Sequence, residues 1–496
     1  MRQRRAAALV AAVLSGVVLV SGCGTRVDPA EVRAGAQANG PVTLDQAALD
    51  QLREAAAAAA NGAAAPAAPG AAGELPDVVG GATVPGSGTT GSPGTTAAPG
   101  STTTKPGTTA AAPAAPADGG KCTTQGAPIA LGQVGTFSGL AGPIAGDGLT
   151  AMAVWAKQVN ARGGLACHPV TLYTRDDGGD PSRAAAATKD LIGRGVVAFV
   201  GNLTALTQSG FLPEIKKNCI PAIGIDFGAE WATEPCLFPQ GGGWRESIAG
   251  LVQQAADRGH RRIGLLYCVE INTCSSIGKD IGAAAKQAGI ELVYSSSISL
   301  TQTDYTAQCQ NAKNAKVEEL VVAMEGSAMA RLARSCVALN YKPLLVGAAW
   351  AVNPKQAEDP QIRELGLAAV NPNAPWFATD QPGLREYQAA LKTYAPQIVS
   401  SGMTLQMWSS GKILEAAVAL LGPAAREKPL TADQILSGLG KIQNETLGGI
   451  TAPLNYAQKG KSRSSGCVFV TLLGKQGWTA PNGSKPLCIS GARDLR

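Results

Sequence analysis

The sequence predicts an α/β fold built on open, mainly parallel sheets, and three observations carry this prediction. A short apolar run at 129–134 has the pattern of a strand and ends in a cluster of glycine, serine and proline. Apolar residues then recur three or four apart from Leu149 to Val159, as one face of a helix requires. A second strand pattern follows at 170–173, so the three segments form a βαβ unit.

Ligands of such sheets bind in the crevice outside the carboxyl ends of the strands. The glycine-rich turn at 136–142 follows the first strand, so we expect it to contact a small molecule. Further strand patterns, each ending near polar or glycine-rich residues, occur at 196–200, 220–225, 263–267, 320–324 and 343–349. Because these strand patterns repeat, the α/β prediction applies to the later parts of the chain as well.

The first 22 residues have the pattern of a signal peptide. Three arginines stand among the first five residues, an apolar run covers 6–20, and small residues follow. The sequence VSGC at 20–23 looks like a bacterial lipobox, which implies diacylation of Cys23; the alternative is ordinary cleavage near this cysteine and free secretion. No later run reaches the ~20 apolar residues of a membrane-spanning helix, so we expect none in the mature chain.

Residues 23–120 are predicted to be a tether. From about residue 56 to 120 the chain is almost entirely Ala, Pro, Gly, Thr and Ser, with little to bury in a core. We therefore expect disorder here, holding the folded part on the order of 50 Å from the lipid.

The charge balance argues against nucleic acid as a partner. Removal of the three arginines of the signal peptide lowers the formal net charge of +6 by three, to +3. No arginine-rich face with interleaved aromatic residues is present in the sequence.

The cysteine count favours disulfides. Eleven cysteines are present, and setting Cys23 aside leaves an even ten. In an exported protein this count favours disulfides over metal or redox chemistry. A zinc site is disfavoured because no Cys-x-x-Cys occurs and because His168 and His260 are the only histidines. We expect neither a metal nor a cofactor.

Several motifs recur in a characteristic order: FSGLAGPIAGDG at 137–148, NARGG at 160–164, YTRDDGGDPSRAAAA at 173–187, VVAFVG at 196–201, GHRRIGLLY at 259–267 and CVALNYKPLLVG at 336–347. Together they resemble the type I periplasmic binding proteins, specifically the branched-chain amino-acid receptors that serve ABC importers. The resemblance covers roughly everything after Pro128, and it depends on the order and spacing of the motifs rather than on any one of them.

The resemblance implies a ligand-binding domain, 121–496, of two lobes joined by three crossovers, each lobe a parallel sheet with helices on both faces. Ligand closes the cleft between the lobes by hinge motion. Lobe 1 would take about 126–243 and 373–445, and lobe 2 about 244–372 and 446–492. The strand order of this fold suggests five disulfides: Cys122 with Cys167, Cys219 with Cys236, Cys268 with Cys274, Cys309 with Cys336, and Cys467 with Cys488.

In the first lobe the resemblance directs attention to two loops. At Ser138 and Gly139, backbone N–H groups and a hydroxyl can reach a ligand carboxylate, although both residues are also ordinary turn formers. In the loop after the strand at 196–200, Thr204 and Thr207 offer hydroxyls. Ala205 departs from the family here, because amino-acid-binding relatives usually carry a serine at this position.

A third loop follows the strand at 220–225 and begins with Asp226 and Phe227. A buried acid facing the ligand must be paired, so Asp226 would select a cationic or hydroxyl-rich ligand. Its alternative role is capping of the helix that begins nearby. Phe227 would stack on a ring or a sugar face, or else pack in the core.

In the second lobe, Ser276, Glu325 and Trp350 are the candidates. Ser276 precedes Ile277, which stands where relatives often place a tyrosine. Glu325 lies near the acid that holds the amino group in amino-acid binders, and Trp350 would form the cleft wall; a solvated glutamate and a packed tryptophan are the alternatives. The family's α-amino and α-carboxylate contacts are thus only partly reproduced, which disfavours a standard branched-chain amino acid.

The function expected from these features is that of a monomeric, lipid-anchored, extracytoplasmic solute-binding protein. It would capture a small polar or aromatic metabolite and deliver it to an ABC permease. The alternative is a ligand sensor or envelope interaction module with the same fold. Catalysis is not expected, because the sequence has no Gly-x-Ser-x-Gly elbow, P-loop or cluster of metal ligands. The adjacent acids Asp176 and Asp177 are interpreted as structural.

Overall fold

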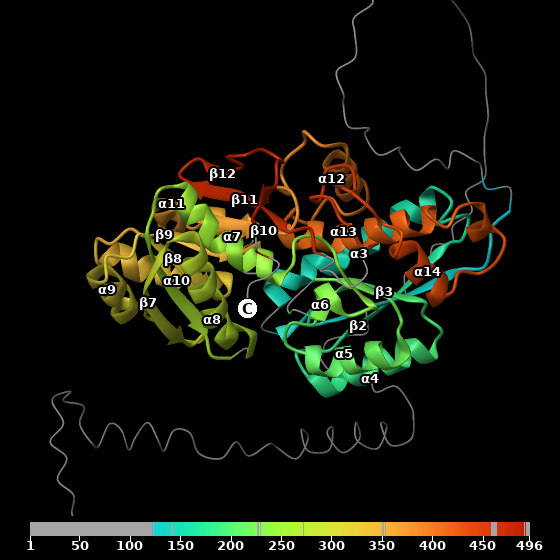
Figure 1. The fold of residues 1–496 in the computed structure, drawn as a ribbon, viewed down its shortest axis with the longest axis horizontal. Helices are drawn as coiled ribbons and strands as arrows, with labels where there is room; N and C mark the ends of the chain where they lie inside the picture. The colour runs from blue at the N-terminus through green and yellow to red at the C-terminus, as the bar shows by residue number, and fades with distance from the viewer. Residues whose placement is uncertain are drawn as a thin grey trace, which may run out of the picture. The chain divides into compact units, whose positions relative to one another are not determined.

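Two separate sheets organise the chain in the computed structural model (Figure 1). The structure describes residues 122, 124–139, 142–225, 228, 230–270, 272–349, 352, 354–457, 464–490 and 492. The signal peptide, Cys23 and the tether predicted above lie outside these residues.

The first sheet is parallel throughout, with the strand order β2-β1-β3-β4-β5. Its strands are β1 (Ile129–Gly135), β2 (Val170–Asp176), β3 (Ala198–Asn202), β4 (Ala222–Gly224) and β5 (Leu237–Pro239). The predicted βαβ unit is present as β1, α3 and β2. Because β1 lies inside the sheet and is buried, its sequence reads as a nearly continuous apolar run.

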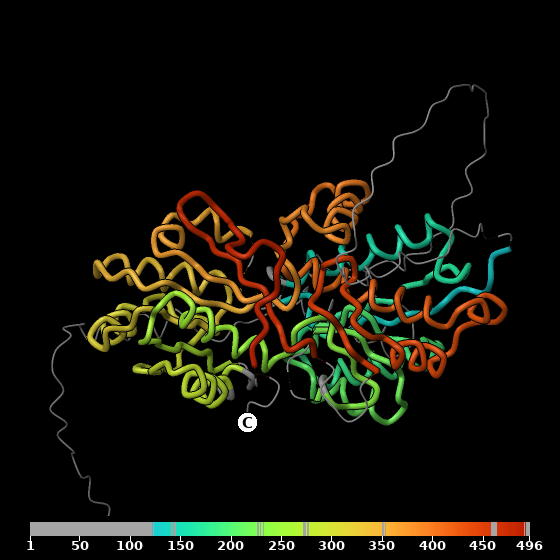
Figure 2. Tube along the Cα trace, turned by 45° about the horizontal axis from the view of Figure 1, so that its top comes forward, coloured from blue at the N-terminus to red at the C-terminus, as the bar shows by residue number. Residues whose placement is uncertain are grey.

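Helices from two distant parts of the chain cover this first sheet. One group follows its strands: α3 (Gly142–Ala161), α4 (Pro181–Gly193), α5 (Gln208–Asn218) and α6 (Glu230–Thr233). The other comes from the C-terminal third: α12 (Pro382–Tyr394), α13 (Gly402–Ala419), η4 (Pro423–Arg426) and α14 (Ala432–Leu439). The orange segment with α12 and α13 lies beside the blue-green elements in both views, and α13 packs along α3 (Figure 2). We call the first sheet with these helices lobe 1.

The second sheet has the order β12-β11-β10-β9-β8-β6-β7, with β13 paired to β11. Its strands are β6 (Arg262–Cys268), β7 (Glu291–Ile298), β8 (Glu319–Ala323), β9 (Leu344–Ala348), β10 (Leu367–Asn371), β11 (Cys467–Gly474), β12 (Gly477–Thr479) and β13 (Leu487–Cys488). Strands β6 to β10 are parallel, as predicted, whereas β11 runs antiparallel to β10, β12 and β13. A short turn joins β11 to β12, as antiparallel neighbours allow, whereas the chain passes through lobe 1 between β10 and β11.

The helices of the second sheet are α7 (Trp244–Asp257), α8 (Asn272–Ala288), α9 (Thr306–Asn314), α10 (Gly326–Ala338), η3 (Pro354–Glu358) and α11 (Pro360–Leu365). Helix α7 packs against α8, and α10 packs against α9 and α11. We call this sheet with its helices lobe 2. The predicted α/β fold with helix-flanked parallel sheets is therefore confirmed.

The chain passes between the lobes three times, after β5, after β10 and before β11. The first two crossovers touch through their backbones, with Gly242 N donating to Pro372 O at 3.1 Å. A Cβ atom on Gly241 would lie 2.6 Å from Pro372 O, and one on Gly242 would lie 2.4 Å from Cys467 O. Glycine is needed at both positions because no side chain fits between the crossovers.

Before the third crossover, residues 446–457 follow the surface of lobe 1. Ala374 N donates to Ile450 O at 2.8 Å, and Tyr456 N donates to Ile442 O at 3.0 Å. The Tyr456 ring also packs edge-on against Phe238, with 5.3 Å between ring centroids. The end of β5 is thereby held against the segment that leads to the last crossover.

Five disulfides are present: Cys122–Cys167, Cys219–Cys236, Cys268–Cys274, Cys309–Cys336 and Cys467–Cys488. These are the same pairs that the strand order suggests. Each closes a local loop within one lobe, so the disulfides restrain the unfolded chain without locking the lobes to each other.

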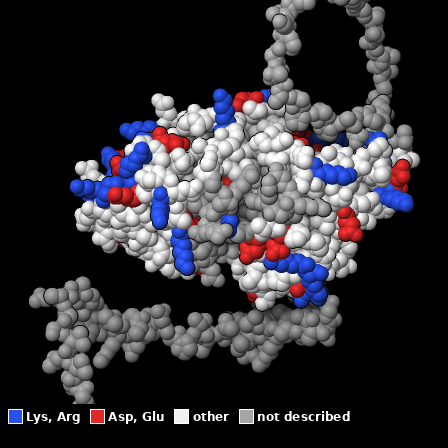
Figure 3. Space-filling view, viewed as in Figure 1, with Lys and Arg blue, Asp and Glu red and all other residues white. Residues whose placement is uncertain are grey.

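Charged side chains are dispersed over the visible face of the molecule (Figure 3). On the face shown in Figure 3, acidic and basic groups are interspersed among mostly uncharged residues. None of the helices in the described part of the chain combines the length and apolar character that crossing a bilayer requires. Within the same residues, no group of His, Cys, Asp and Glu is arranged to hold a metal ion.

Candidate functional site

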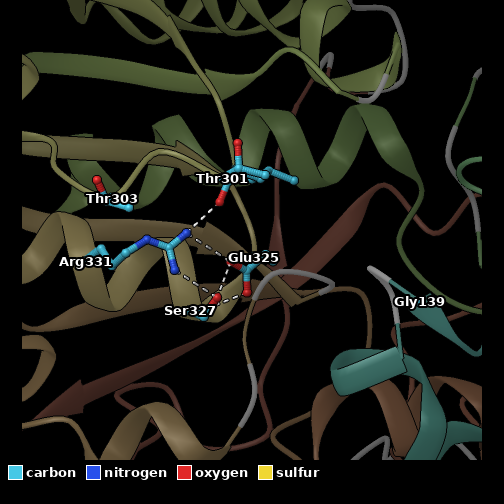
Figure 4. Close-up of a pocket in the computed structure, with 7 residues that line it drawn as sticks. Gly139, Thr301, Thr303, Glu325, Ser327 and Arg331 are labelled. Atoms are coloured by element: carbon cyan, nitrogen blue, oxygen red, sulfur yellow. Dashed lines mark hydrogen bonds and ion pairs between the residues drawn. The ribbon is translucent and has the colours of Figure 1, made fainter. Parts of the chain in front are cut away.

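A cavity of about 410 Å³ lies where loops of the two lobes face each other (Figure 4). Its volume falls in the usual range for small-molecule sites. The lining residues are Gly139, Leu300, Thr301, Thr303, Glu325, Ser327 and Arg331. They follow β1, β7 and β8 or begin α10, so the cavity lies at the carboxyl ends of parallel strands, where ligands of open α/β sheets bind.

Gly139 forms the lobe 1 side of the cavity. Its φ of +62° is in the left-handed region, which favours glycine, and among the described residues beyond its chain neighbours no atom lies within 4 Å of a Cβ atom placed there. The glycine therefore serves the turn and leaves open space in front of it. This is the turn that the sequence predicts to contact a ligand.

The neighbouring Ser138 is tied to Asp176. Burial raises the pKa of Asp176. Hydrogen bonds from the Ser138 side chain and from the N–H groups of Phe137 and Gly178 together lower the pKa by more than burial raises it, so the pKa lies below its usual value. The N–H of Phe137 donates to Asp176 Oδ1 at 2.9 Å. The Ser138 hydroxyl thus positions the turn, and a ligand would meet it as part of this hydrogen-bonded loop.

Asp177 is buried and joins three loops. Its Oδ1 accepts hydrogen bonds from Thr136 Oγ1 at 2.7 Å and Gly179 N at 2.9 Å, and its Oδ2 accepts one from Thr207 Oγ1 at 2.6 Å. Burial raises the pKa of Asp177 above its usual value, against the opposing effect of these hydrogen bonds. The geometry agrees with a structural role for the acid pair.

The predicted threonines of the loop after β3 differ in their environments. Thr207 is buried and its hydroxyl donates to Asp177. Thr204 is also buried, and its Oγ1 has no hydrogen-bond partner among the described residues. Ala205 packs against the core. These three residues do not line the described cavity.

Several predicted site residues lie outside what the structure describes. These are Asp226, Phe227, Trp350 and the side chain of Ser276, whose backbone belongs to α8. Their roles in the cleft stay predictions.

Glu325 lines the cavity and also caps α10. Its Oε2 accepts a hydrogen bond from Ser327 N at 2.6 Å, and its Oε1 accepts from Ala328 N at 2.6 Å and from Ser327 Oγ at 2.5 Å. The residue has the extended backbone of a helix N-cap. Its carboxylate is thus held by the first turn of its own helix, a role that the sequence did not predict.

Arg331 is the second charged group of the cavity and was missed by the sequence prediction. Its Nε donates to Gln302 O at 2.9 Å, Nη2 to Leu300 O at 2.5 Å, and Nη1 to Ser327 Oγ at 3.3 Å. Its Nη2 also lies 3.9 Å from Glu325 Oε1 (Figure 4). The arginine therefore fixes the loop after β7 against the start of α10.

Glu270 supports the same loop from the end of β6. Its Oε1 accepts hydrogen bonds from Ser299 Oγ at 2.6 Å and from Leu300 N at 2.8 Å. Burial raises the pKa of Glu270, but these hydrogen bonds lower it more, so the pKa lies below the usual value. The Cys268–Cys274 disulfide spans the segment that contains Glu270.

The sequence did carry a signal for these missed residues. After the strand at 291–298 and Leu300 comes a polar run, 301–304, and Arg331 follows Glu325 by six residues on the next helix. The carboxyl end of every strand is a candidate for the ligand site. Thr301 and Thr303 follow the carboxyl end of β7, so this rule indicates them as candidates.

Comparison with known proteins decides the family. The family model described as periplasmic binding protein matches residues 128–474. The chain belongs to the periplasmic binding protein family. Its fold is that of the type I periplasmic binding proteins, as the motifs predict. No curated protein matches this periplasmic binding protein in sequence.

Solved structures of other periplasmic binding proteins share the fold. A branched-chain amino acid ABC transporter protein from Thermus thermophilus with bound valine has a TM-score of 0.67 and 15% identity, covering 75% of this chain and 99% of that one. A fatty acid ABC transporter substrate-binding protein from Thermomonospora curvata has a TM-score of 0.65 and 18% identity, covering 75% and 96%. A solute binding protein from R. palustris in complex with benzoate has a TM-score of 0.60 and 13% identity, covering 73% and 98%.

Proposed function

We propose that this periplasmic binding protein is tethered to the extracytoplasmic face of the membrane by lipid on Cys23. It captures a small polar or aromatic metabolite between its lobes and delivers it to an ABC importer. The cavity of about 410 Å³, lined by Gly139 from lobe 1 and by six residues from lobe 2, is the observation that carries this proposal. A molecule bound there touches both lobes, so its binding energy favours the closed arrangement.

The crossovers supply the hinge for this closure. Gly241 and Gly242 bring three chain segments into backbone contact, and the five disulfides each lie within a lobe. Hinge motions are absorbed by a few residues between rigid units. Each lobe therefore moves as a body about this point.

The relatives support a small organic ligand without specifying one. Those with known structures are described with valine, with benzoate and as a fatty acid transport component. For this chain, a standard branched-chain amino acid is disfavoured, because Ala205 lacks the usual hydroxyl and Glu325 is engaged by Ser327 and Ala328. Asp226, Phe227, Ser276 and Trp350 complete the proposed binding surface, with Ser138, Thr204 and Thr207 supporting its lobe 1 side.

Thermal unfolding of the full chain, kept oxidised, tests ligand capture. The probes are amino acids, amides, polyamines, sugars and organic acids. A ligand at a thousand times its dissociation constant stabilises the folded state by about 4 kcal/mol, which is a shift of several degrees. A shift with one chemical class supports capture. No shift with any class, together with an empty cavity by native mass spectrometry, contradicts it and favours an interaction module.

Two further measurements test the tether and the delivery step. Cys23→Ala should release the protein from the membrane fraction if the lipid is the anchor, while wild type and a Cys122→Ala control stay attached. Deletion of the protein from its host should abolish uptake of the ligand. Unchanged uptake would contradict delivery and favour the sensor.

A further inference from the structure

Arg331 brings the hydrogen-bond donors of a guanidinium to the cavity. A guanidinium carries five N–H bonds. The contacts of Arg331 with Gln302, Leu300 and Ser327 use three of them, one on each nitrogen. Its side chain is 23% exposed and lines the cavity. The Tyr305 hydroxyl and Glu325 also interact with the guanidinium. The N–H bonds of the terminal nitrogens that these neighbours leave over can bind a ligand carboxylate.

The threonines of the loop after β7 add hydroxyl groups to the cavity. The Ser299 hydroxyl donates to Glu270, so the Thr301 hydroxyl donates to Ser299 Oγ, at 2.8 Å, and offers the ligand an acceptor oxygen, whereas the Thr303 side chain also lines the cavity. Both line the same side of the cavity as Arg331 (Figure 4). An oxygen-rich group of the ligand meets hydroxyls as well as the guanidinium here.

The one carboxylate that lines the described cavity is poorly placed to bind an ammonium group. Glu325 already accepts three hydrogen bonds from Ser327 and Ala328. The positive charge of Arg331 lies 3.9 Å from it and opposes a second cation. A ligand ammonium has three N–H donors that must find acceptors when they leave water.

We propose that the ligand is an organic acid without an α-amino group, and that Arg331 binds its carboxylate. This inference depends on the proposed function and names its substrate class. The hydrocarbon part of the acid extends from Arg331 past Leu300 toward Gly139, where the missing side chain leaves room. This ligand class differs from the expectation for Asp226, which would select a cationic or hydroxyl-rich ligand.

Matched pairs of probes test the proposal with the full, oxidised chain. Each pair is an acid and its α-amino counterpart, such as 3-phenylpropanoate with phenylalanine and 4-methylpentanoate with leucine, within a panel of aliphatic and aromatic monocarboxylates. The primary amide of each acid is a third probe. Calorimetry should show an acid binding at least about tenfold more tightly than both its amino acid and its amide, since the contact to the guanidinium is charge-assisted.

Variants assign the contact to Arg331. Arg331→Gln should weaken binding of the acid about 10- to 100-fold, and Arg331→Lys should restore part of it, because lysine keeps the charge but not the fork of donors. Arg334→Gln is the matched control: it lies on the same helix, is 54% exposed and pairs with Asp359, and it does not line the cavity. Glu325→Gln removes the negative charge 3.9 Å from the guanidinium and should strengthen binding of the acid.

The outcomes separate this inference from the proposed function. Tighter binding of an amino acid than of its acid, or loss of binding in Glu325→Gln, overturns the inference and keeps the protein a solute-binding protein. The inference is also overturned, and the proposed function kept, if only sugars or polyamines bind. It is likewise overturned if Arg331→Gln lowers the melting temperature while the affinity for the acid is unchanged. No binding by any class of probe overturns both.

Discussion

Thr207 Oγ1 donates a hydrogen bond of 2.6 Å to Asp177 Oδ2, and this contact joins the loops that follow β3 and β2. Asp177 also accepts from Thr136, in the turn after β1. Three adjacent strands of lobe 1 therefore share one buried carboxylate at their carboxyl ends. The turn that contains Gly139 is held in place by the hydrogen bond between Thr136 and this acid.

Loss of the Thr207 hydroxyl should destabilise lobe 1. Thr207→Val keeps the shape of the side chain but removes a donor from a buried carboxylate, which costs about 1–3 kcal/mol. Denaturant unfolding measures the change. Thr393→Val is the control, because the Thr393 hydroxyl is exposed and bonds to its own helix, at Ala389 O. Equal stability of the two variants would show that Asp177 does not depend on Thr207.

The two neighbouring acids should affect the pH dependence of stability in opposite directions. The pKa of Asp176 is lowered on folding, so its contribution is present above the ordinary value of 3.8 and is lost as pH falls through the lower folded pKa. The pKa of Asp177 is raised, so its contribution is present below 3.8 and is lost as pH rises through the higher folded pKa.

Unfolding of wild type, Asp176→Asn and Asp177→Asn as a function of pH measures this difference. The stability of wild type relative to Asp176→Asn should decrease as the solution is made more acidic than 3.8. Relative to Asp177→Asn it should increase as pH falls toward 3.8. Slopes of the same sign for both variants would contradict the assignment.

A side chain at the first crossover should disturb both stability and closure. In Gly241→Ala the new methyl group would lie 2.6 Å from Pro372 O, so the backbone of one crossover must shift. Such overpacking costs about 1–3 kcal/mol. Gly282→Ala is the control, since it lies in α8 and, apart from its own helix backbone, no described atom lies within 4 Å of the added carbon; it should be neutral or slightly stabilising.

The Cys268–Cys274 disulfide should matter for ligand affinity more than a disulfide remote from the cavity. It spans Glu270, which holds Ser299 and Leu300 in place. Replacing both of its cysteines with alanine should weaken ligand binding measured by calorimetry. Replacing Cys309 and Cys336, which are buried in the core between α9 and α10, should lower the melting temperature with affinity unchanged. The reverse pattern would contradict the role of the Glu270 loop.

Local patterns were sufficient for much of the fold. The βαβ unit at 129–173, the turn at Gly139 and the even number of cysteines all depend on residues close in sequence or on simple counting. The packing of α13 against α3 joins segments far apart in the chain, and the resemblance to a family supplied it. The antiparallel direction of β11 was missed because a buried strand has the same apolar pattern in either direction.

The site was less predictable because side-chain partners decide it. Glu325 was placed at the cleft from its position after a strand, but capping of α10 depends on the rotamer that brings both oxygens to Ser327 and Ala328. Arg331 belongs to the second turn of α10, and helical side chains lean toward the N-terminus. That direction brings its guanidinium to the cavity, which residue spacing after a strand does not reveal.

Hydrogen exchange with and without the ligand found by screening tests capture between the lobes most directly. The account predicts slower exchange, on binding, of backbone amides at 136–139 in lobe 1 and at both 300–303 and 325–331 in lobe 2, because one molecule contacts both walls of the cavity. Protection confined to one lobe, or located away from these segments, would contradict the assignment of the cavity as the ligand site.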